Sequence, residues 1–251
     1  MKLNERVAIV TGAAQGLGRA YAIRLADEGA RIVIADIGDG SGVRDEIAKK
    51  GGQAIMTHTD VSDEESVRAM ARETIERFGR IDILVNNAGL FTTVAKKPFY
   101  DISVEEWDRV MSVNVKGTFL CSKAVYPQMK KQGKGKIINI SSATFFMGAP
   151  NFGHYVASKG AVVGLTRAFA REVGDSGICV NAIAPGLTVS EIIRGNAKYP
   201  EEYLKLVASG RSIKRDETPD DLTGAVVFLA SDDSDFLTGQ TIVVDGGLIM
   251  Y

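Results

Sequence analysis

Thr11-Gly12-Ala13-Ala14-Gln15-Gly16-Leu17-Gly18 is the stretch that decides the fold. An apolar, β-branched run at residues 7–10 precedes it and an amphipathic segment starts near Leu17, so the context predicts a strand, a glycine turn and a helix. Glycine permits the turn, and without a Cβ a phosphate can approach the free N–H groups of a helix N-terminus. The G-x-x-x-G-x-G spacing therefore predicts a phosphate-binding turn; the alternative is a glycine turn that binds no ligand.

A second predicted strand, at residues 31–35, ends in Asp36. A carboxylate about twenty residues beyond such a turn can accept hydrogen bonds from a ribose hydroxyl, so the two features together predict a dinucleotide site. Asp36 would repel a 2′-phosphate, and neither Gln15 nor Ile37 supplies a neighbouring cation. We therefore expect NAD rather than NADP.

The composition is that of an ordinary globular protein, with 251 residues, 45% hydrophobic and 24% charged. A net charge of −1 offers no basic face, so we expect neither nucleic acid nor membrane as a partner. The two histidines are far apart in the sequence and no metal-ligand spacing occurs, so we expect no metal. Without a signal-like start or a long apolar run, the chain is expected to be cytoplasmic.

Strand and helix patterns alternate to the end of the chain without a linker, which predicts one α/β domain over residues 1–251. We expect a Rossmann-type, doubly wound, parallel seven-stranded sheet with helices on both faces. Residues 187–212 are the predicted substrate loop, with a weakly patterned helix near 190–210. Ligands bind beyond the carboxyl ends of such strands. The residues predicted at those ends are Gly12, Asp36, Asp60, Asn87, Ser142 and Pro185.

Several local predictions accompany this fold. Capping boxes are expected at Ser62 and Ser103, the latter opening one long helix, and Thr218 is expected to cap the last helix. Cys121 and Cys179 lie in apolar runs and are expected to be buried thiols. Lysines gather where a helix is expected to end, and a solvated helix C-terminus is the favoured interpretation of that cluster. Its members are Lys130, Lys131, Lys134 and Lys136.

Two polar residues have open interpretations. Asp60 either helps to cap the following helix or reaches an adenine amino group. Asn114 falls near the apolar stripe of its predicted helix, so it is either a satisfied core amide or part of the site, because an unpaired buried amide costs on the order of 1–3 kcal/mol.

Tyr155 and Lys159 are four residues apart on a predicted helix, so their side chains share a face, and they follow the strand-end Ser142. A free phenol has a pKa of about 10, and using it as a base near neutral pH requires about 3–4 kcal/mol of stabilisation of the phenolate. An ammonium about 4 Å away supplies on the order of 4 kcal/mol at an effective dielectric of ~20. Lys159 is therefore expected to lower the pKa of Tyr155, with Ser142 holding the substrate oxygen and Asn114 linking Lys159 to solvent.

With these residues in place, the chain resembles the short-chain dehydrogenase/reductase family over essentially its whole length. The resemblance rests on six motifs in order: Thr11-Gly12-x-x-x-Gly16-x-Gly18, Asn87-Ala88-Gly89, Asn114, Ser142, Tyr155-x-x-x-Lys159 and Pro185-Gly186. It implies hydride transfer between NAD(P) and an alcohol or carbonyl, with Tyr155 as acid/base, Ser142 as substrate anchor, Lys159 as ribose ligand and Asn114 as relay. Ser190 stands where the family often has Thr, which keeps the hydroxyl.

Residue arguments and resemblance together predict a set of cofactor contacts in addition to Tyr155 and Lys159. They are Gly12, Gln15, Gly16, Leu17, Gly18, Asp36, Ile37, Asp60, Val61, Asn87, Ala88, Gly89, Pro185, Gly186 and Thr188.

Aromatic residues follow two of the site motifs, at residues 90–91 and 143–152. They either line a flat, apolar substrate pocket or pack the sheet edge. The segment is similar to family members that oxidise aryl secondary alcohols such as phenylethanols, or pyridoxal. The resemblance also implies a homotetramer, with helices at 107–128 and 156–171 pairing across an interface; the alternative is that these helices serve only the core.

Two other functions stay open. The first is a 3-oxoacyl-[acyl-carrier-protein] reductase, against which Asp36 and the net charge of −1 argue. The second is a sensor that binds NAD without turnover, against which the presence of Ser142, Tyr155, Lys159 and Asn114 argues.

Overall fold

The strands of the computed structural model, which describes residues 1–250, form one parallel sheet in the order β3-β2-β1-β4-β5-β6-β7. The order reverses direction at β1, because β2 and β3 lie on one side of it and β4 to β7 on the other. The strands are β1 (Val7–Thr11), β2 (Arg31–Asp36), β3 (Ala54–His58), β4 (Ile83–Asn86), β5 (Gly135–Ile140), β6 (Ile178–Pro185) and β7 (Thr241–Val244). The predicted doubly wound α/β fold is confirmed.

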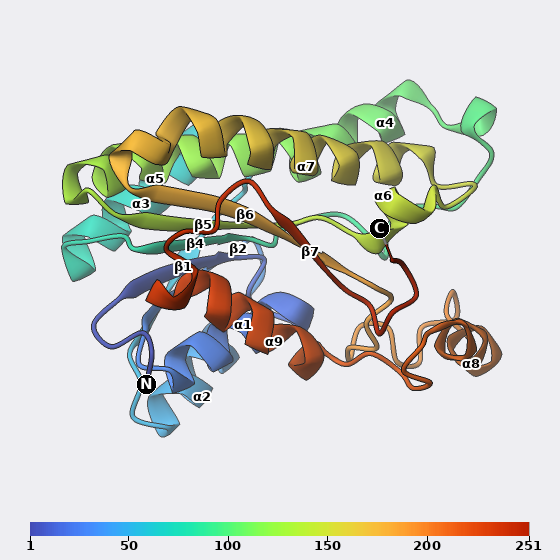
Figure 1. Cartoon of the computed structure of the whole chain (residues 1–251), viewed down its shortest axis with the longest axis horizontal. Coiled ribbons are helices and arrows are strands. Elements are labelled where there is room, and N and C mark those ends of the chain that lie inside the picture. The colour runs from blue at the N-terminus through green and yellow to red at the C-terminus, as the bar shows by residue number, and fades with distance from the viewer. Residues whose placement is uncertain (251) are drawn as a thin grey trace.

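Helices cover both faces of the sheet (Figure 1), with α1, α2 and α9 on one face and α3, α5 and α7 on the other. The helices are α1 (Gly16–Asp27), α2 (Ser41–Lys49), α3 (Glu64–Phe78), α4 (Val104–Met111), α5 (Gly117–Gln132), α6 (Ala143–Met147), α7 (Gly153–Val173), α8 (Glu201–Gly210) and α9 (Pro219–Ala230). Short 3₁₀ turns occupy Phe99–Asp101, Gly174–Ser176 and Asp232–Ser234.

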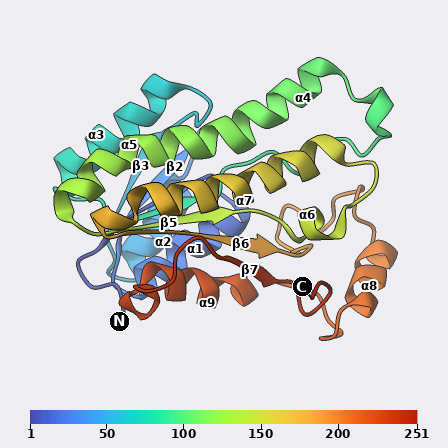
Figure 2. The same ribbon diagram turned by 45° about the horizontal axis from the view of Figure 1, so that its top comes forward.

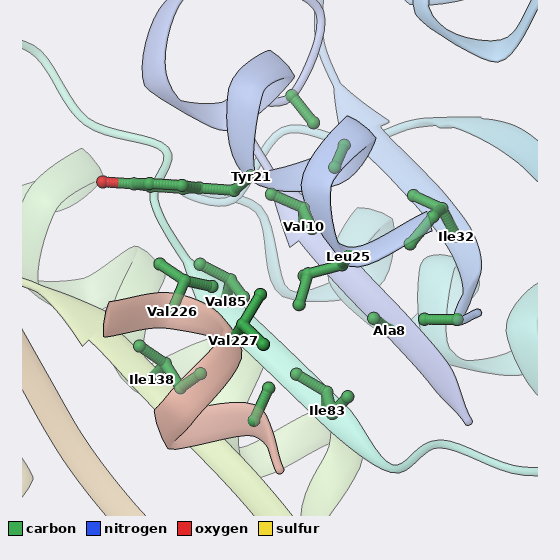
Figure 3. Packing of buried hydrophobic residues seen from close by; sticks show 14 of the residues in the cluster. Ala8, Val10, Tyr21, Leu25, Ile32, Ile83, Val85, Ile138, Val226 and Val227 are labelled. Carbon is green, nitrogen blue, oxygen red and sulfur yellow. The ribbon is translucent and has the colours of Figure 1, made fainter. Parts of the chain in front are cut away.

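The alternation of side chains along β1 explains why its sequence is apolar throughout. Ala8 and Val10 belong to the core under α1 and α9, whereas Val7 and Ile9 belong to the core under α3 and α5. Figure 3 shows the first core, where side chains from the strands meet those from α1 and α9. Tyr21 packs its ring there, with its oxygen directed away from the labelled cluster.

The carboxyl ends of the strands lie along one edge of the sheet. The turns after β1 and β4, the short helix α6 and the segment carrying α8 gather at this edge, and the described C-terminal segment ends beside it (Figures 1 and 2). The edge is therefore built from loops that are far apart in the sequence.

Two of the three predicted helix caps are confirmed. Ser103 and Glu106 form a reciprocal capping box on α4, and the Asp221 carboxylate accepts hydrogen bonds from the Thr218 N–H and hydroxyl at the start of α9. The box predicted at Ser62 is wrong, because the carboxylate of Asp63 caps α3 through the N–H of Ser66 at 2.7 Å. The free N–H groups at the start of α3 need an acceptor, and Asp63, one residue after Ser62, provides it.

The helix predicted as one long element after Ser103 is divided. A π-helical turn at Ser112–Lys116 separates α4 from α5, so the helix gains a residue in the region that carries Asn114. The helix predicted near 190–210 begins only at Glu201, after Pro200 in an extended conformation. The predicted helix that carries Tyr155 and Lys159 is α7, which begins at Gly153.

The lysine cluster is not a uniformly solvated helix end. Lys136 is buried on β5, where its ammonium pairs with Asp235 at 2.9 Å, and Lys134 also pairs with Asp235. These pairs join β5 to the segment before β7, which lies about 100 residues later in the sequence. Cys121 is buried as expected, whereas Cys179 is only half-buried, so that prediction is wrong for one of the two thiols.

Candidate active site

A cavity of about 1100 Å³ lies at the carboxyl edge of the sheet. Its wall brings together nearly every residue predicted for the site, although these residues come from the carboxyl ends of six strands and from α7. Asn114 and Gly18 do not line it. The predicted residues that do are Gly12, Gln15, Gly16, Leu17, Asp36, Ile37, Asp60, Val61, Asn87, Ala88, Gly89, Ser142, Tyr155, Lys159, Pro185, Gly186 and Thr188.

Glycine is required by geometry in the turn after β1. Gly12 and Gly16 have φ of 64° and 58°, a region that residues with a Cβ rarely adopt. A Cβ on Gly18 would lie 2.1 Å from the Gly12 carbonyl oxygen, so this glycine serves the close packing of α1 on the turn. The first two glycines thus shape the cavity wall, and the third supports them from behind.

The N-terminus of α1 already holds an anionic group. The Gly16 N–H donates to Glu191 Oε1 at 2.7 Å, and the N-cap residue Gln15 contributes no side-chain cap. A carboxylate at this position shows that the helix end accepts negative charge from across the cleft. The donor set therefore fits the pyrophosphate of a dinucleotide. The sequence did not single out Glu191. Its place directly after Ser190, in the loop following β6, could have indicated that it lies near the site.

The acidic residues on this side of the cavity are held in place by backbone and hydroxyl donors. Asp36 accepts hydrogen bonds from the N–H groups of Ala14 and Gly38, at 2.9 and 2.8 Å. Asp60 accepts from the N–H and hydroxyl of Ser62, which lower the pKa of its carboxyl group. Asp60 shapes the turn before α3 and does not cap that helix, whose cap is Asp63; it also faces the cavity.

Tyr155 and Lys159 lie on α7, opposite Ser142 at the end of β5. Lys159 is buried, its ammonium donates to the Ile140 carbonyl at 2.8 Å, and it lies 5.7 Å from the centre of the Tyr155 ring. Burial lowers the pKa of Lys159 from 10.5 to about 8.

Burial raises the pKa of the Tyr155 phenol, and a hydrogen bond with Ser142 opposes that rise. Burial therefore outweighs the Ser142 bond at this phenol, and the effect of Lys159 on its pKa stays a prediction. The ammonium of Lys159 is turned toward the Ile140 carbonyl.

Asn114 is a satisfied buried amide in the π-helical turn. Its Oδ1 accepts from the Leu90 N–H at 2.7 Å, and its Nδ2 donates to Ser158 Oγ at 3.0 Å. A Cβ on Gly89 would lie 3.2 Å from Asn114 Oδ1 and 3.5 Å from Lys159 Nζ, so the three residues meet at one point. Asn114 thus fixes the turn that lines the cavity beside Lys159, and its role as a proton relay stays a prediction.

Aromatic rings form the wall next to Tyr155. Phe152 stacks on Tyr155 with ring centroids 4.5 Å apart, and Phe91 contacts Tyr155 at 5.4 Å and Tyr199 at 5.8 Å. These rings line the cavity, whereas Phe145 lies against Gly160 and is not part of the wall. The predicted aromatic segments therefore divide between the cavity and the packing around α7.

A buried ion pair holds the substrate loop at both ends, and sequence reasoning missed it. The Thr188 hydroxyl donates to Glu217 Oε1 at 2.6 Å, while the Arg211 guanidinium lies 3.5 Å from Glu217 Oε2 and donates to the Leu187 carbonyl. Burial raises the pKa of Glu217 to about 7, against the lowering effect of the Thr188 bond and Arg211.

Within residues 1–250, no cluster of three or more His, Cys, Asp or Glu side chains has the arrangement of a metal site. Over the same residues, none of the helices combines the length and apolar character needed to cross a bilayer.

Residues 12–249 match a family model described as enoyl-(acyl carrier protein) reductase. The BbsD subunit of (2S)-[(R)-hydroxy(phenyl)methyl]succinyl-CoA dehydrogenase from Thauera aromatica is 40% identical, with 100% of this chain and 99% of that protein covered. The 3-oxoacyl-[acyl-carrier-protein] reductase FabG of Staphylococcus aureus is 38% identical, with 97% and 98% covered. The structure of levodione reductase superposes with a TM-score of 0.92 at 34% identity, covering 97% of each chain.

The ordered motifs, the sheet topology and these full-length similarities agree. The chain belongs to the short-chain dehydrogenase/reductase family, whose oxidoreductases use NAD(P).

Proposed function

We propose that the protein is an NAD-dependent dehydrogenase that interconverts a secondary alcohol, with an aryl or similarly flat apolar body, and its ketone. The observation that carries this proposal is the stacking of Phe152 and Phe91 around Tyr155 within one cavity that also contains Asp36. Flat rings beside the acid/base favour a flat substrate. The relatives named for a phenyl-bearing substrate and for levodione reduction support the same class.

The proposed residue roles follow from their positions. Tyr155 removes the hydroxyl proton in the oxidative direction and returns it in reduction, and Ser142 donates a hydrogen bond to the substrate oxygen. The Lys159 ammonium favours the phenolate and binds a ribose hydroxyl. NAD bound in the cleft would supply the hydride acceptor, together with a positive charge that favours ionisation of Tyr155.

The preference for NAD rests on Asp36. Its carboxylate is held by two backbone N–H groups at the end of β2, and its lining neighbours Gln15 and Ile37 carry no charge. A 2′-phosphate placed there would meet the carboxylate without a compensating cation from these neighbours, which costs a few kcal/mol at close range. Binding of NAD is therefore expected to exceed that of NADP by orders of magnitude.

Steady-state kinetics with purified protein test the proposal. We expect oxidation of 1-phenylethanol and related alcohols with NAD, a kcat/KM at least about 100-fold lower with NADP, and a loss of about 100-fold or more in kcat for Tyr155→Phe. Tyr126→Phe, on α5 and outside the lining of the cavity, is the matched control. Equal use of NADP, or near-normal turnover by Tyr155→Phe, would refute the cofactor assignment or the mechanism respectively.

A 3-oxoacyl-[acyl-carrier-protein] reductase is the second candidate, favoured by the 38% identity to FabG. It predicts turnover of acetoacetyl-carrier protein with NADPH, and this substrate is added to the same kinetic measurements as the test. A cytoplasmic location stays a prediction from the sequence.

We further infer a homotetramer, in which α4, α5 and α7 pair with their counterparts. Trp107 on α4 and Phe119 on α5 each expose 41% of their surface, and a Cβ on Gly164 of α7 would meet no atom within 4 Å. Exposed aromatic side chains, and a glycine with open space where a Cβ would lie, suit the close approach of another helix. Light scattering is expected to give four times the 26.9 kDa chain mass; a monomer would contradict the inference.

A further inference from the structure

The substrate end of the cavity contains an ammonium group that has no carboxylate partner among the described residues. Lys96 Nζ lies 5.0 Å from the ring centre of Tyr203 and 5.8 Å from those of Phe152 and Tyr199, and it donates to the Tyr203 hydroxyl at 3.3 Å. Its neighbour Lys97 instead pairs with Glu106 at 2.7 Å. The aromatic faces attract the Lys96 cation and position it, but they do not neutralise its charge.

The distribution of charge along the cavity makes this end attractive to an anion. The carboxylates lining the cavity, within residues 1–250, are Asp36 and Asp60, which follow β2 and β3 on the far side of β1. Tyr155 and Lys96 lie on the other side, next to the turns after β4 and β5. A lysine with free N–H donors and no acidic neighbour can form a charge-assisted hydrogen bond with an incoming oxyanion.

The position of Lys96 relative to Tyr155 limits the shape of that anion. The ring of Phe152 contacts both groups: its centre lies 4.5 Å from that of Tyr155, on which it stacks, and 5.8 Å from Lys96 Nζ. A substrate whose reacting oxygen meets Tyr155 can therefore present a charged group to Lys96 from the opposite end of one aromatic ring.

We propose that the physiological substrate carries a carboxylate across an aryl body from its secondary alcohol or ketone, and that Lys96 binds this carboxylate. The inference rests on the proposed dehydrogenase function and names the substrate class within it. Lys96 is then a specificity-determining residue that acts on substrate binding and leaves proton transfer to Tyr155.

A charged substrate and a neutral substrate of the same shape provide the test. The probes are 4-(1-hydroxyethyl)benzoate and its methyl ester, whose oxidation with NAD is followed by NADH absorbance. We expect the native protein to favour the acid by about 10-fold in kcat/KM, through a lower KM, because an accessible charge-assisted bond contributes modestly. Lys96→Met is expected to lose this preference, and Lys96→Arg to keep most of it.

Lys97→Met is the matched control, because Lys97 pairs with Glu106 and does not line the cavity; it is expected to keep the preference. The inference is overturned if the native protein oxidises the ester as well as the acid, or if Lys96→Met retains the full preference. Turnover of neither compound would instead overturn the proposed function and, with it, this inference. Because the ester reports turnover without the charge, the two failures are distinguishable.

Discussion

Individual residues in the site show how much burial changes their chemistry. Tyr155 and Lys159 are one helical turn apart, as the sequence predicts, yet burial raises the pKa of the phenol and lowers that of the ammonium to about 8. Burial thus opposes ionisation of the phenol. Alcohol oxidation needs the phenol to ionise, and positive charge nearby favours the ionised form. The loss of the Lys159 ammonium is therefore expected to matter more at this buried site.

Removal of the Lys159 charge is expected to make the base weaker. Lys159→Met should raise the apparent pKa in the pH profile of kcat for alcohol oxidation, and lower kcat at neutral pH by about 100-fold, because phenolate formation loses its nearest cation. The measurement is kcat against pH with saturating NAD. Lys50→Met removes a surface ammonium paired with Asp27 and should leave the profile unchanged. An unshifted profile for Lys159→Met would contradict this role.

At the scale of elements, the loop after β6 and the N-terminus of α1 form a contact that spans the cofactor cleft. Glu191 accepts the Gly16 N–H, and the Ile192 side chain lies 2.8 Å from where a Cβ of Gly16 would be. The glycine turn therefore positions the substrate loop. The same helix end cannot serve two anions at once, so Glu191 would compete with the pyrophosphate of a bound dinucleotide.

Glu191→Gln is expected to tighten NADH binding by about 3-fold, because a neutral amide competes less well than a carboxylate for the positive end of α1. The dissociation constant is measured by fluorescence titration of NADH. Glu202→Gln changes an exposed carboxylate in the first turn of α8 and should leave the constant unaltered. Weaker NADH binding to Glu191→Gln would indicate that Glu191 assists the cofactor rather than competing with it.

At the scale of the whole molecule, the buried pair of Glu217 and Arg211 connects the substrate loop to the core. The carbonyl of Glu217 accepts the Val189 N–H at 2.7 Å, and its carboxyl group accepts the Thr188 hydroxyl, so the two ends of the loop are held together. A carboxyl group at this depth makes folding sensitive to pH, since its pKa is raised to about 7.

The sign of that pH dependence follows from proton binding. The folded protein binds the Glu217 proton more tightly than the unfolded chain, so this group's stabilising contribution is complete below about pH 4 and is lost as the pH rises through about 7. Glu217→Gln should flatten the corresponding fall in the free energy of unfolding, by about 1–3 kcal/mol, in urea titrations across this range. Glu201→Gln, on the surface of α8, is the control. If the free energy of unfolding of Glu217→Gln fell by the same amount over this pH range, the pH dependence would belong to other titrating groups.

Much of the fold was predictable because it depends on local or periodic patterns. The glycine turn needs positive φ at Gly12 and Gly16, and the apolar run of β1 has two buried faces to fill. The cap at Ser103 depends on a residue only three positions away. The cap predicted at Ser62 was wrong because adjacent Asp63 meets the same requirement, and the pattern does not distinguish two neighbouring acceptors.

The sequence by itself determined the doubly wound sheet, its family and the positions along the chain of the predicted site residues, because strand periodicity, turn chemistry and spacing along one helix are properties of neighbouring residues. Only the tertiary structure decided which groups meet across the cleft: Glu191 with Gly16, Lys96 with its aromatic rings, and Glu217 with Arg211. It also decided the direction of the pKa shifts, since desolvation depends on the whole surrounding fold and not on the residues next in the chain.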